Sequence, residues 1–251
     1  MIAGAPARQG GSVFYAASAL SRMGTRARIA ASCAVLDRPQ LVEPLEAFGL
    51  PVAWHESSVT AAYSFHYEGD RRIMRQDAVG DPWNAEQAVE AVGDARWVHV
   101  GALVRTDFPE GTLAALAAGR RLLVDAQGLV RTPEAGPLRL DGRIGGALRH
   151  VAMLKLNEEE AETLAGSAEP EGLRSLRVPE VILTLGSQGS FVITAREIEH
   201  VPTPPMQRSV DPTGAGDVFS SAYLAARAAY AEPVEAARSA TEIVAAFLDE
   251  G

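Results

Sequence analysis

The fold of this chain is decided by residues 211–217, which read Asp-Pro-Thr-Gly-Ala-Gly-Asp. Apolar residues then recur at four-residue spacing from Val218 to Tyr230, which predicts a helix with one apolar face. The glycines allow a tight turn, and the first N–H groups of a helix lack partners, so this junction predicts an anion site. Asp217 in the first turn indicates a base that takes a proton from a hydroxyl as a phosphoryl group arrives. The alternative is an Asp that only complements the helix dipole.

This junction resembles the signature of the ribokinase-like (PfkB) carbohydrate kinases, and the similarity extends from about Gly10 to the C-terminal helix. The resemblance implies ATP-dependent phosphorylation of a hydroxyl on a sugar, polyol or nucleoside. Asp217 would be the general base. The amides of Gly214, Ala215 and Gly216 would form the anion hole for the transferred phosphate.

Strand and helix patterns alternate along most of the chain, which indicates βαβ units and a parallel sheet. Among these patterns are a short helix over residues 40–48 and a strand over residues 121–125. We therefore expect one α/β domain over residues 1–251 with a mainly parallel central sheet. The resemblance implies that this domain is a ribokinase-like three-layer sandwich with a partial β lid. Residues 60–75 alternate, turn at Gly69 and return, which predicts a hairpin. The resemblance implies that residues 52–76 form the lid over the sugar. An edge hairpin of the main sheet is the alternative.

An Asn-x-x-Glu pattern, Asn157 and Glu160, follows a predicted strand and opens a predicted helix. Acidic residues in a first helical turn suit the helix dipole, and on the residues alone that is their whole role. The resemblance implies that Asn157 and Glu160 help to hold the Mg²⁺ that accompanies ATP, with contact through water.

The nucleotide side of the predicted site begins at residues 183–190, which read as a strand, a glycine-containing turn and a second strand. The resemblance implies a set of ATP-binding residues: Thr184, Gly186, Gly189, Asn157, Thr213 and Thr241. Thr241 stands on the last helix where the family often has Asn, and residues 202–208 would flank the adenine from the other side. We also expect a monovalent cation near Asp211.

The substrate side of the predicted site begins at Gly10 and Gly11, before a predicted helix for which Ser12 is a candidate N-cap. By resemblance the Gly-Gly turn approaches the sugar, and Tyr15 stands where sugar kinases commonly carry Asn. This variant is similar to the inositol-kinase-like branch, so we expect myo-inositol or a nucleoside to be preferred over ribose and fructose. The alternative is that Tyr15 packs in the core. Gln127 and Arg131 would add donors at the far side of the substrate.

The start of the sequence departs from the family pattern. The family opens with a central strand that ends near a substrate-binding Asp, but only nine residues precede Gly10 and a strand alone takes about 5–6. A fragment, a misassigned start and a degenerate relative all fit this observation. A nucleotide- or polyol-binding protein without catalysis is therefore a second hypothesis. A Rossmann oxidoreductase is a third hypothesis. It is disfavoured because Gly214 and Gly216 lack the third glycine of a dinucleotide-binding fingerprint.

Composition narrows the range of partners. A net charge of −9 argues against nucleic acid and membrane surfaces. The single Cys33 excludes an internal disulfide and, with no apolar run of about 18 residues, favours the cytoplasm.

Lys155 is the one lysine among 23 basic residues and is assigned no function. The five histidines are scattered and read as strand or loop residues, with His66 on the lid the one of interest. A homodimer through the lid is also expected.

Overall fold

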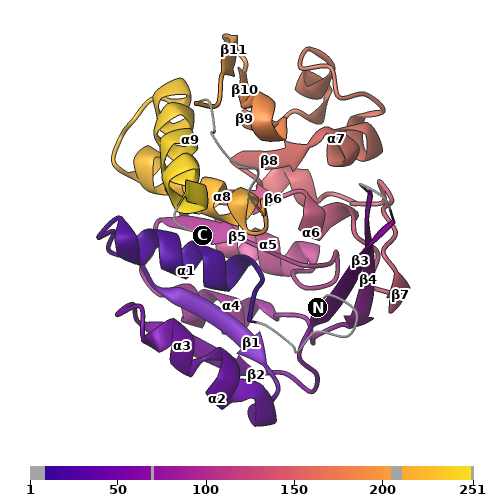
Figure 1. The fold of residues 1–251 in the computed structure, drawn as a ribbon, viewed down its shortest axis with the longest axis vertical. Coiled ribbons are helices and arrows are strands. Elements are labelled where there is room, and N and C mark those ends of the chain that lie inside the picture. Colours follow the sequence, from indigo (N-terminus) through magenta and orange to yellow (C-terminus); the bar gives the residue numbers. More distant parts are fainter. Residues whose placement is uncertain (1–8, 69–70, 205–210, 250–251) are drawn as a thin grey trace.

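The structure is a computed structural model that describes residues 9–68, 71–204 and 211–249. Its central sheet has six strands, given in the order in which they lie side by side: β11 (Ile198–Val201), β10 (Ser190–Thr194), β9 (Glu180–Thr184), β8 (Met153–Asn157), β6 (Arg121–Asp125) and β5 (Trp97–Val100). β5, β6, β8 and β9 run parallel, whereas β10 pairs antiparallel with β9 and β11. The prediction of a mainly parallel sheet is confirmed (Figure 1).

Helices cover both faces of this sheet (Figure 1). One face carries α4 (Ala85–Val92), α5 (Glu110–Ala117) and α7 (Glu158–Ala165), and the other carries α8 (Ala215–Ala228) and α9 (Pro233–Asp249). The remaining helical elements are α1 (Ser12–Arg22), α2 (Arg38–Leu41), α3 (Glu43–Glu46), α6 (Gln127–Val130) and 3₁₀ turns at Val35–Asp37, Ala147–His150, Gly172–Leu176 and Gly186–Gln188. In the described ranges no helix combines the length and the apolar character that crossing a membrane requires.

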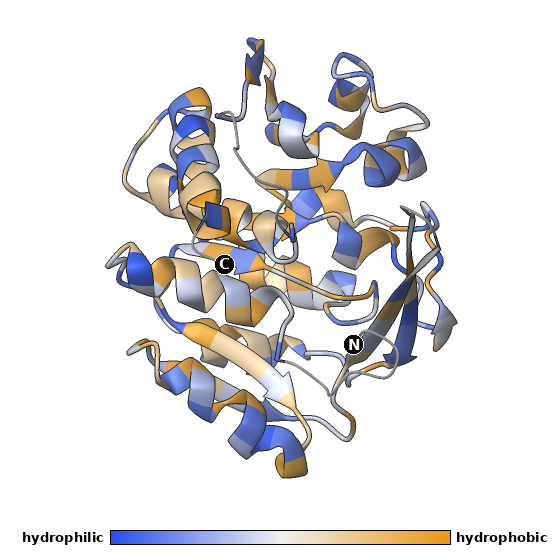
Figure 2. Ribbon diagram, viewed as in Figure 1, coloured by the Kyte–Doolittle hydropathy of each residue, from blue (hydrophilic) through white to orange (hydrophobic). Residues whose placement is uncertain are grey.

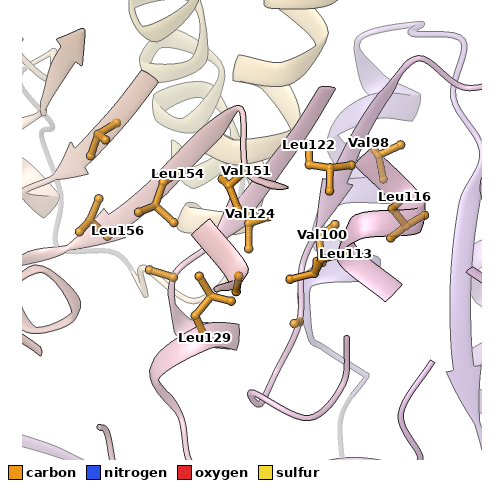
Figure 3. Packing of buried hydrophobic residues seen from close by; sticks show 14 of the residues in the cluster. Val98, Val100, Leu113, Leu116, Leu122, Val124, Leu129, Val151, Leu154 and Leu156 are labelled. Atoms are coloured by element: carbon orange, nitrogen blue, oxygen red, sulfur yellow. The ribbon is translucent and has the colours of Figure 1, made fainter. Parts of the chain in front are cut away.

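Strand β6 shows how the sequence builds two cores. Leu122 and Val124 face a core shared with α5, whereas Leu123 faces a second core against α8 and α9, and all three are 0 % exposed. Successive side chains of a strand point to opposite faces, so a strand covered on both faces is apolar throughout. Figure 3 shows side chains of β5, β6 and β8 meeting those of α5 in the first core. Outer helices such as α9 alternate in hydropathy, as Figure 2 shows, because they bury one face only.

Two smaller sheets flank the central one. β1 (Ile29–Cys33) and β2 (Val52–Glu56) form a parallel pair. β3 (Ala62–Glu68), β4 (Arg71–Ala78) and β7 (Gly136–Pro137) form an antiparallel sheet that stands beside the body (Figure 1). The expected lid boundary at residue 52 was therefore too early: residues 52–56 belong to the body, because they pair with β1, and the separate sheet begins at Ala62.

The edge strands β1 and β5 face one cavity of about 1940 Å³. Every residue of both strands lines it, and none of the strands described pairs with β5 on this side or with β1 on the side away from β2. The cavity continues to Gly11, Tyr15 and Asp217, so this gap between the sheets opens into the predicted substrate side.

Two local predictions were wrong. The helix expected over residues 40–48 is two short helices, α2 and α3, because Pro44 has no N–H to continue the first one. Tyr230 does not extend the apolar face of α8: it follows the helix with a left-handed φ of 68° and is 93 % exposed.

Candidate active site

The turn that was predicted to bind an anion, residues 214–216, lies at the start of α8 and is called the anion turn below. Gly214 is the N-cap of α8, with φ 84° and ψ −7°, a left-handed conformation that favours glycine. A Cβ on Gly214 would also lie 2.3 Å from the Tyr15 ring, so the close approach of α1 requires glycine a second time. The Ala215 amide donates to the Pro212 carbonyl at 3.0 Å and closes the turn. The backbone has the shape that the sequence predicted, and anion binding by these amides stays a prediction.

Asp217 lies in the first turn of α8 and lines the cavity. Burial raises the pKa of its carboxyl group, and the negative charge of Asp125 adds to this effect. A hydrogen bond from the Ser12 side chain, together with Lys155 and His99, acts in the opposite direction. Ser12 was expected to cap α1, but Gly11 is the N-cap and Ser12, the first helical residue, turns its hydroxyl to Asp217.

A buried cluster of four side chains, the Asp125 cluster, lies behind Asp217. Asp125, the last residue of β6, is 1 % exposed and accepts a hydrogen bond from the Ser220 hydroxyl at 2.8 Å. His99 Nε2 lies 2.5 Å from its Oδ2, and Lys155 Nζ lies 3.3 Å from its Oδ1. Burial on its own would raise the pKa of Asp125, but Lys155 and His99 outweigh it and hold the pKa well below its usual range.

Lys155 connects this cluster to the anion turn. Its side chain is 11 % exposed, and a Cβ built on Gly216 would lie 2.8 Å from its Nζ. Burial opposes the charged form, but the carboxylates of Asp125, Glu160 and Asp217 outweigh this, so the pKa of Lys155 is raised and the ammonium stays charged.

Asn157 and Glu160 form a reciprocal capping box at the start of α7. The Asn157 side chain accepts from the Glu160 amide and the Glu160 carboxylate accepts from the Asn157 amide, each at 2.9 Å. Glu160 is 5 % exposed, and burial raises the pKa of its carboxyl group. Amide and carboxylate oxygens suit Mg²⁺, but both side chains are engaged in the cap, so the arrangement fits a metal held through water. The metal role stays a prediction.

The predicted nucleotide residues lie in two groups. Asn157 and Thr184 are register partners on β8 and β9, so they lie side by side at the carboxyl ends of the two strands. Gly189 has φ 95°, and a Cβ there would lie 2.1 Å from the Val201 carbonyl oxygen, so the backbone packing already requires glycine. Gly186 follows Thr184 at the start of a 3₁₀ turn.

The second group lies on α9 and before α8. The Thr241 hydroxyl, buried, donates to the Ala237 carbonyl at 2.8 Å on its own helix. The Thr213 hydroxyl and amide both donate to Asp211 Oδ1, at 2.6 and 3.0 Å. Nucleotide contacts of Thr213 and Thr241, and the monovalent cation near Asp211, stay predictions. Residues 205–208 of the expected adenine loop lie outside the described residues.

The predicted substrate residues come together on the cavity wall: Gly10, Gly11, Tyr15, Gln127, Arg131 and Asp217. Tyr15 packs edge-on against Phe14 and Phe247, with ring centroids 5.5 and 6.2 Å apart, so it combines core packing with a place on the wall. Gln127 Nε2 lies 3.4 Å from Ser12 Oγ.

The members of the Asp125 cluster were not predicted as site residues. His99, Asp125 and Lys155 each stand near the carboxyl end of a neighbouring parallel strand, β5, β6 and β8. Ligands of open α/β sheets bind at this edge, so a polar residue late in an apolar strand was the available signal.

The fold and this junction define the class: a ribokinase-like α/β protein with a carboxylate at a glycine turn before a helix. Residues 10–248 match the pfkB family carbohydrate kinases, and the chain belongs to this family.

Solved structures share the fold at low sequence identity. A pyrophosphate-dependent kinase of the ribokinase family, complexed with a pyrophosphate analog and myo-inositol, is 22 % identical with a TM-score of 0.85, over 99 % of this chain and 90 % of that one. Burkholderia thailandensis nucleoside kinase with inosine is 22 % identical (TM-score 0.73; 95 % and 78 % covered). Arabidopsis thaliana ribokinase with ribose and ATP is 19 % identical (TM-score 0.75; 96 % and 81 % covered).

Proposed function

We propose that this chain transfers a phosphoryl group from ATP to a hydroxyl of a sugar, polyol or nucleoside. The observation that carries the proposal is the place of Asp217, in the first turn of α8 and on the wall of a cavity that Gly10 and Gln127 also line. A base there reaches an acceptor in the cavity and a donor phosphate at the anion turn together, as in-line transfer requires.

Asp217 takes the proton of the attacking hydroxyl. The hydroxyl oxygen bonds to the γ-phosphorus, the bond from that phosphorus to the β–γ bridging oxygen breaks, and ADP leaves. Burial raises the pKa of Asp217, which makes its carboxylate a stronger base than a solvated one. The hydrogen bond from Ser12 orients the carboxylate, because Ser12 is fixed at the start of α1.

Asn157 and Glu160 would hold Mg²⁺ through water at the start of α7. When bound, Mg²⁺ neutralises charge on the donor phosphates. The capping box fixes both side chains relative to β8, so their oxygens keep one position while donor and product exchange.

For the acceptor we propose myo-inositol or a nucleoside. Tyr15 lines the cavity, and an aromatic ring on the wall supports a flat, cyclic acceptor. Two of the similar structures hold myo-inositol and inosine, which fits this acceptor class. Pyrophosphate is the second candidate donor, because the Thr241 hydroxyl is already bonded within α9 and three of the similar structures are of pyrophosphate-dependent kinases.

The test is an activity assay on a panel of acceptors: myo-inositol, inosine, ribose and fructose 6-phosphate. Each acceptor is tested with ATP, where the release of ADP is measured, and with pyrophosphate, where the release of orthophosphate is measured. Asp217→Asn should keep binding of AMP-PNP, a non-hydrolysable ATP analogue, but lower kcat by about 10²–10⁴. Glu235→Gln is the matched control, because Glu235 is an exposed carboxylate in the first turn of α9 and tests the dipole alone.

Near-normal kcat in Asp217→Asn would contradict the base. Ribose or fructose 6-phosphate as best acceptor by kcat/KM would overturn the proposed acceptor class. AMP-PNP binding without turnover of any pair would favour the alternative, a nucleotide- or polyol-binding relative without catalysis. The homodimer through the three-stranded sheet stays a prediction.

A further inference from the structure

A buried glutamine stands in the middle of the three-stranded sheet. Gln76 lies on β4, where its register partners are Tyr63 on β3 and Gly136 on β7, and it is 0 % exposed. Its Oε1 accepts from the Tyr63 hydroxyl at 2.8 Å, whereas its Nε2 donates to the carbonyls of Thr132 and Glu134 at 3.3 and 3.2 Å. Burying an amide costs free energy unless its donors and its acceptor find partners, and both do here. The amide thus holds β3, β4 and the loop after α6 in one arrangement.

The face of the sheet that carries Tyr63 lines the cavity. Side chains alternate between the two faces of a strand, so Tyr63 and Phe65 point to the same side of β3. Met74 is the register partner of Phe65 on β4, and all three residues line the cavity. The sheet therefore gives the cavity an aromatic and apolar wall.

The Tyr63 hydroxyl reaches the acceptor side of the site. It lies 3.2 Å from the Leu103 carbonyl oxygen. Gln127 Nε2 lies 3.4 Å from the carbonyl oxygen of the residue before Leu103, and 3.4 Å from Ser12 Oγ. Ser12 in turn bonds Asp217. Tyr63 and Asp217 are thus two points of one cavity wall, connected through neighbouring carbonyls of one loop.

The three-stranded sheet is tied to the body by the loop that supplies β7. This loop, residues 131–141, follows α6 and returns to it, because the Asp141 amide donates to the Val130 carbonyl at 2.9 Å. Between these two points β7 pairs with β4, and the Leu138 amide donates to the Met74 carbonyl at 3.1 Å. Moving the sheet away from the cavity would break this pairing and leave the buried glutamine amide without partners, which costs free energy. The pairing therefore opposes such a movement.

We propose that Gln76 is a positioning residue for the acceptor, which fixes the Tyr63 ring on the cavity wall and ties the sheet to the loop after α6. The three-stranded sheet is then a preformed wall of the acceptor site and not a lid that closes when the acceptor binds. The inference rests on the proposed function, because an acceptor of the proposed class is what meets Tyr63. With Tyr15 also on the wall, the ring of that acceptor meets aromatic side chains from both α1 and β3.

Calorimetry measures the binding of myo-inositol and of inosine to the wild type and to Gln76→Met, and the better bound of the two is the probe. Methionine keeps the length of the side chain but has no amide. A Tyr63 ring that is no longer fixed must be ordered when the acceptor binds, so the Kd should rise by about 3- to 10-fold, the scale of immobilising one side chain. Binding of AMP-PNP, or of imidodiphosphate if pyrophosphate is the donor, should be unchanged.

A double-mutant cycle tests whether Gln76 acts through Tyr63. Tyr63→Phe removes the hydroxyl that Gln76 holds, so the two single variants should weaken the acceptor about equally and their losses should not add in the double variant. Ser64→Ala is the matched control. It removes the hydrogen bond from Ser64 on β3 to Asp77 on β4, which lies on the opposite face, and should leave the Kd unchanged. If Gln76→Met does not fold, Tyr63→Phe is compared with Ser64→Ala in its place.

Hydrogen exchange of the free protein, followed by NMR, tests the preformed wall. The Leu138 amide, which bonds the Met74 carbonyl, should be protected without any acceptor, and Gln76→Met should make it exchange faster. A Leu138 amide that is unprotected in the free protein and becomes protected only with the acceptor would show a closing lid and overturn the inference.

The binding outcomes separate this inference from the proposed function. An unchanged acceptor Kd in Gln76→Met, an equal loss of donor affinity, additive losses in the cycle or an equal loss in Ser64→Ala each overturn the role of Gln76. A wild type that binds neither myo-inositol nor inosine also overturns it. A wild type that binds the acceptor but phosphorylates nothing refutes the proposed function alone, and the cycle still decides the role of Gln76.

Discussion

Substituting Gly214 by alanine tests how α1 and α8 are joined at the anion turn. Gly214 has φ 84° and ψ −7°, and its Cβ would lie 2.3, 2.4 and 2.7 Å from three ring carbons of Tyr15. Gly166, which ends α7, has almost the same backbone, φ 74° and ψ 5°, but nothing within 4 Å of a Cβ. The two glycines therefore share the conformational cost of a side chain and differ in the steric one.

The magnitude follows from these two parts. A left-handed conformation costs a non-glycine residue about 1–2 kcal/mol, and this is the whole expected loss for Gly166→Ala. At Gly214 the Tyr15 ring must also leave its packing on Phe14 and Phe247, and overpacking of this kind costs about 1–3 kcal/mol more. Gly214→Ala should thus lose about 2–5 kcal/mol of unfolding free energy, the sum of the two.

Urea unfolding of both variants measures the difference directly. The change in unfolded-chain entropy from glycine to alanine is common to both and cancels. In a Tyr15→Ala background the ring is gone, so Gly214→Ala should cost only the conformational part. Equal losses for Gly214→Ala and Gly166→Ala, or an undiminished loss without the Tyr15 ring, would refute the steric reasoning.

Three further predictions concern two carboxylates of the site, Asp217 and Glu160. Folding raises the pKa of Asp217, so between its unfolded and folded values the native state binds more protons and stability falls as pH rises. Asp217→Asn should therefore melt higher than the wild type at pH 7.5; the gain should shrink as the pH falls through the raised pKa of Asp217 and be lost below about pH 4, the unfolded pKa of Asp. Equal melting temperatures of the two proteins at pH 7.5 would contradict this. In the wild type, kcat/KM should fall as pH drops through the raised pKa. Glu160→Gln should raise the Mg²⁺ concentration for half-maximal rate while keeping the α7 cap, since Gln also serves in a capping box; an unchanged Mg²⁺ dependence would leave Glu160 as a capping residue only.

The local parts of the fold were predictable from the sequence. Residues 121–125 were expected as a strand and form β6. A short apolar run that follows a turn residue, here Gly119, is typical of a buried strand. Val52–Glu56 was assigned to the lid because a short strand does not reveal its partner, and its parallel pairing with β1 is a tertiary fact. Ser12 was read as a cap because its role depends on Asp217, about two hundred residues along the chain.

The candidate site shows the same limit. Gly214 to Asp217 could be found because they are adjacent in the sequence and the turn requires them locally. His99, Asp125 and Lys155 come from three strands whose order in the sheet decides that they meet. Each was visible in the sequence as a polar residue in a mostly apolar strand. Their contact was not.

The open edges of β1 and β5 have a consequence for how the molecule opens. In residues 9–68, 71–204 and 211–249, no ladder of hydrogen bonds joins the pair β1–β2 to the six-stranded sheet across the cavity. The two blocks are held by side-chain packing, with α1 lying against both β1 and α8 (Figure 1). Native-state hydrogen exchange should then divide the chain into two protection classes, with β1 and β2 exchanging through a smaller opening than β6 and β8. Because α1 carries Tyr15 onto Gly214 and Ser12 to Asp217, an opening that also detached α1 from α8 would separate the Asp217 carboxylate from Ser12.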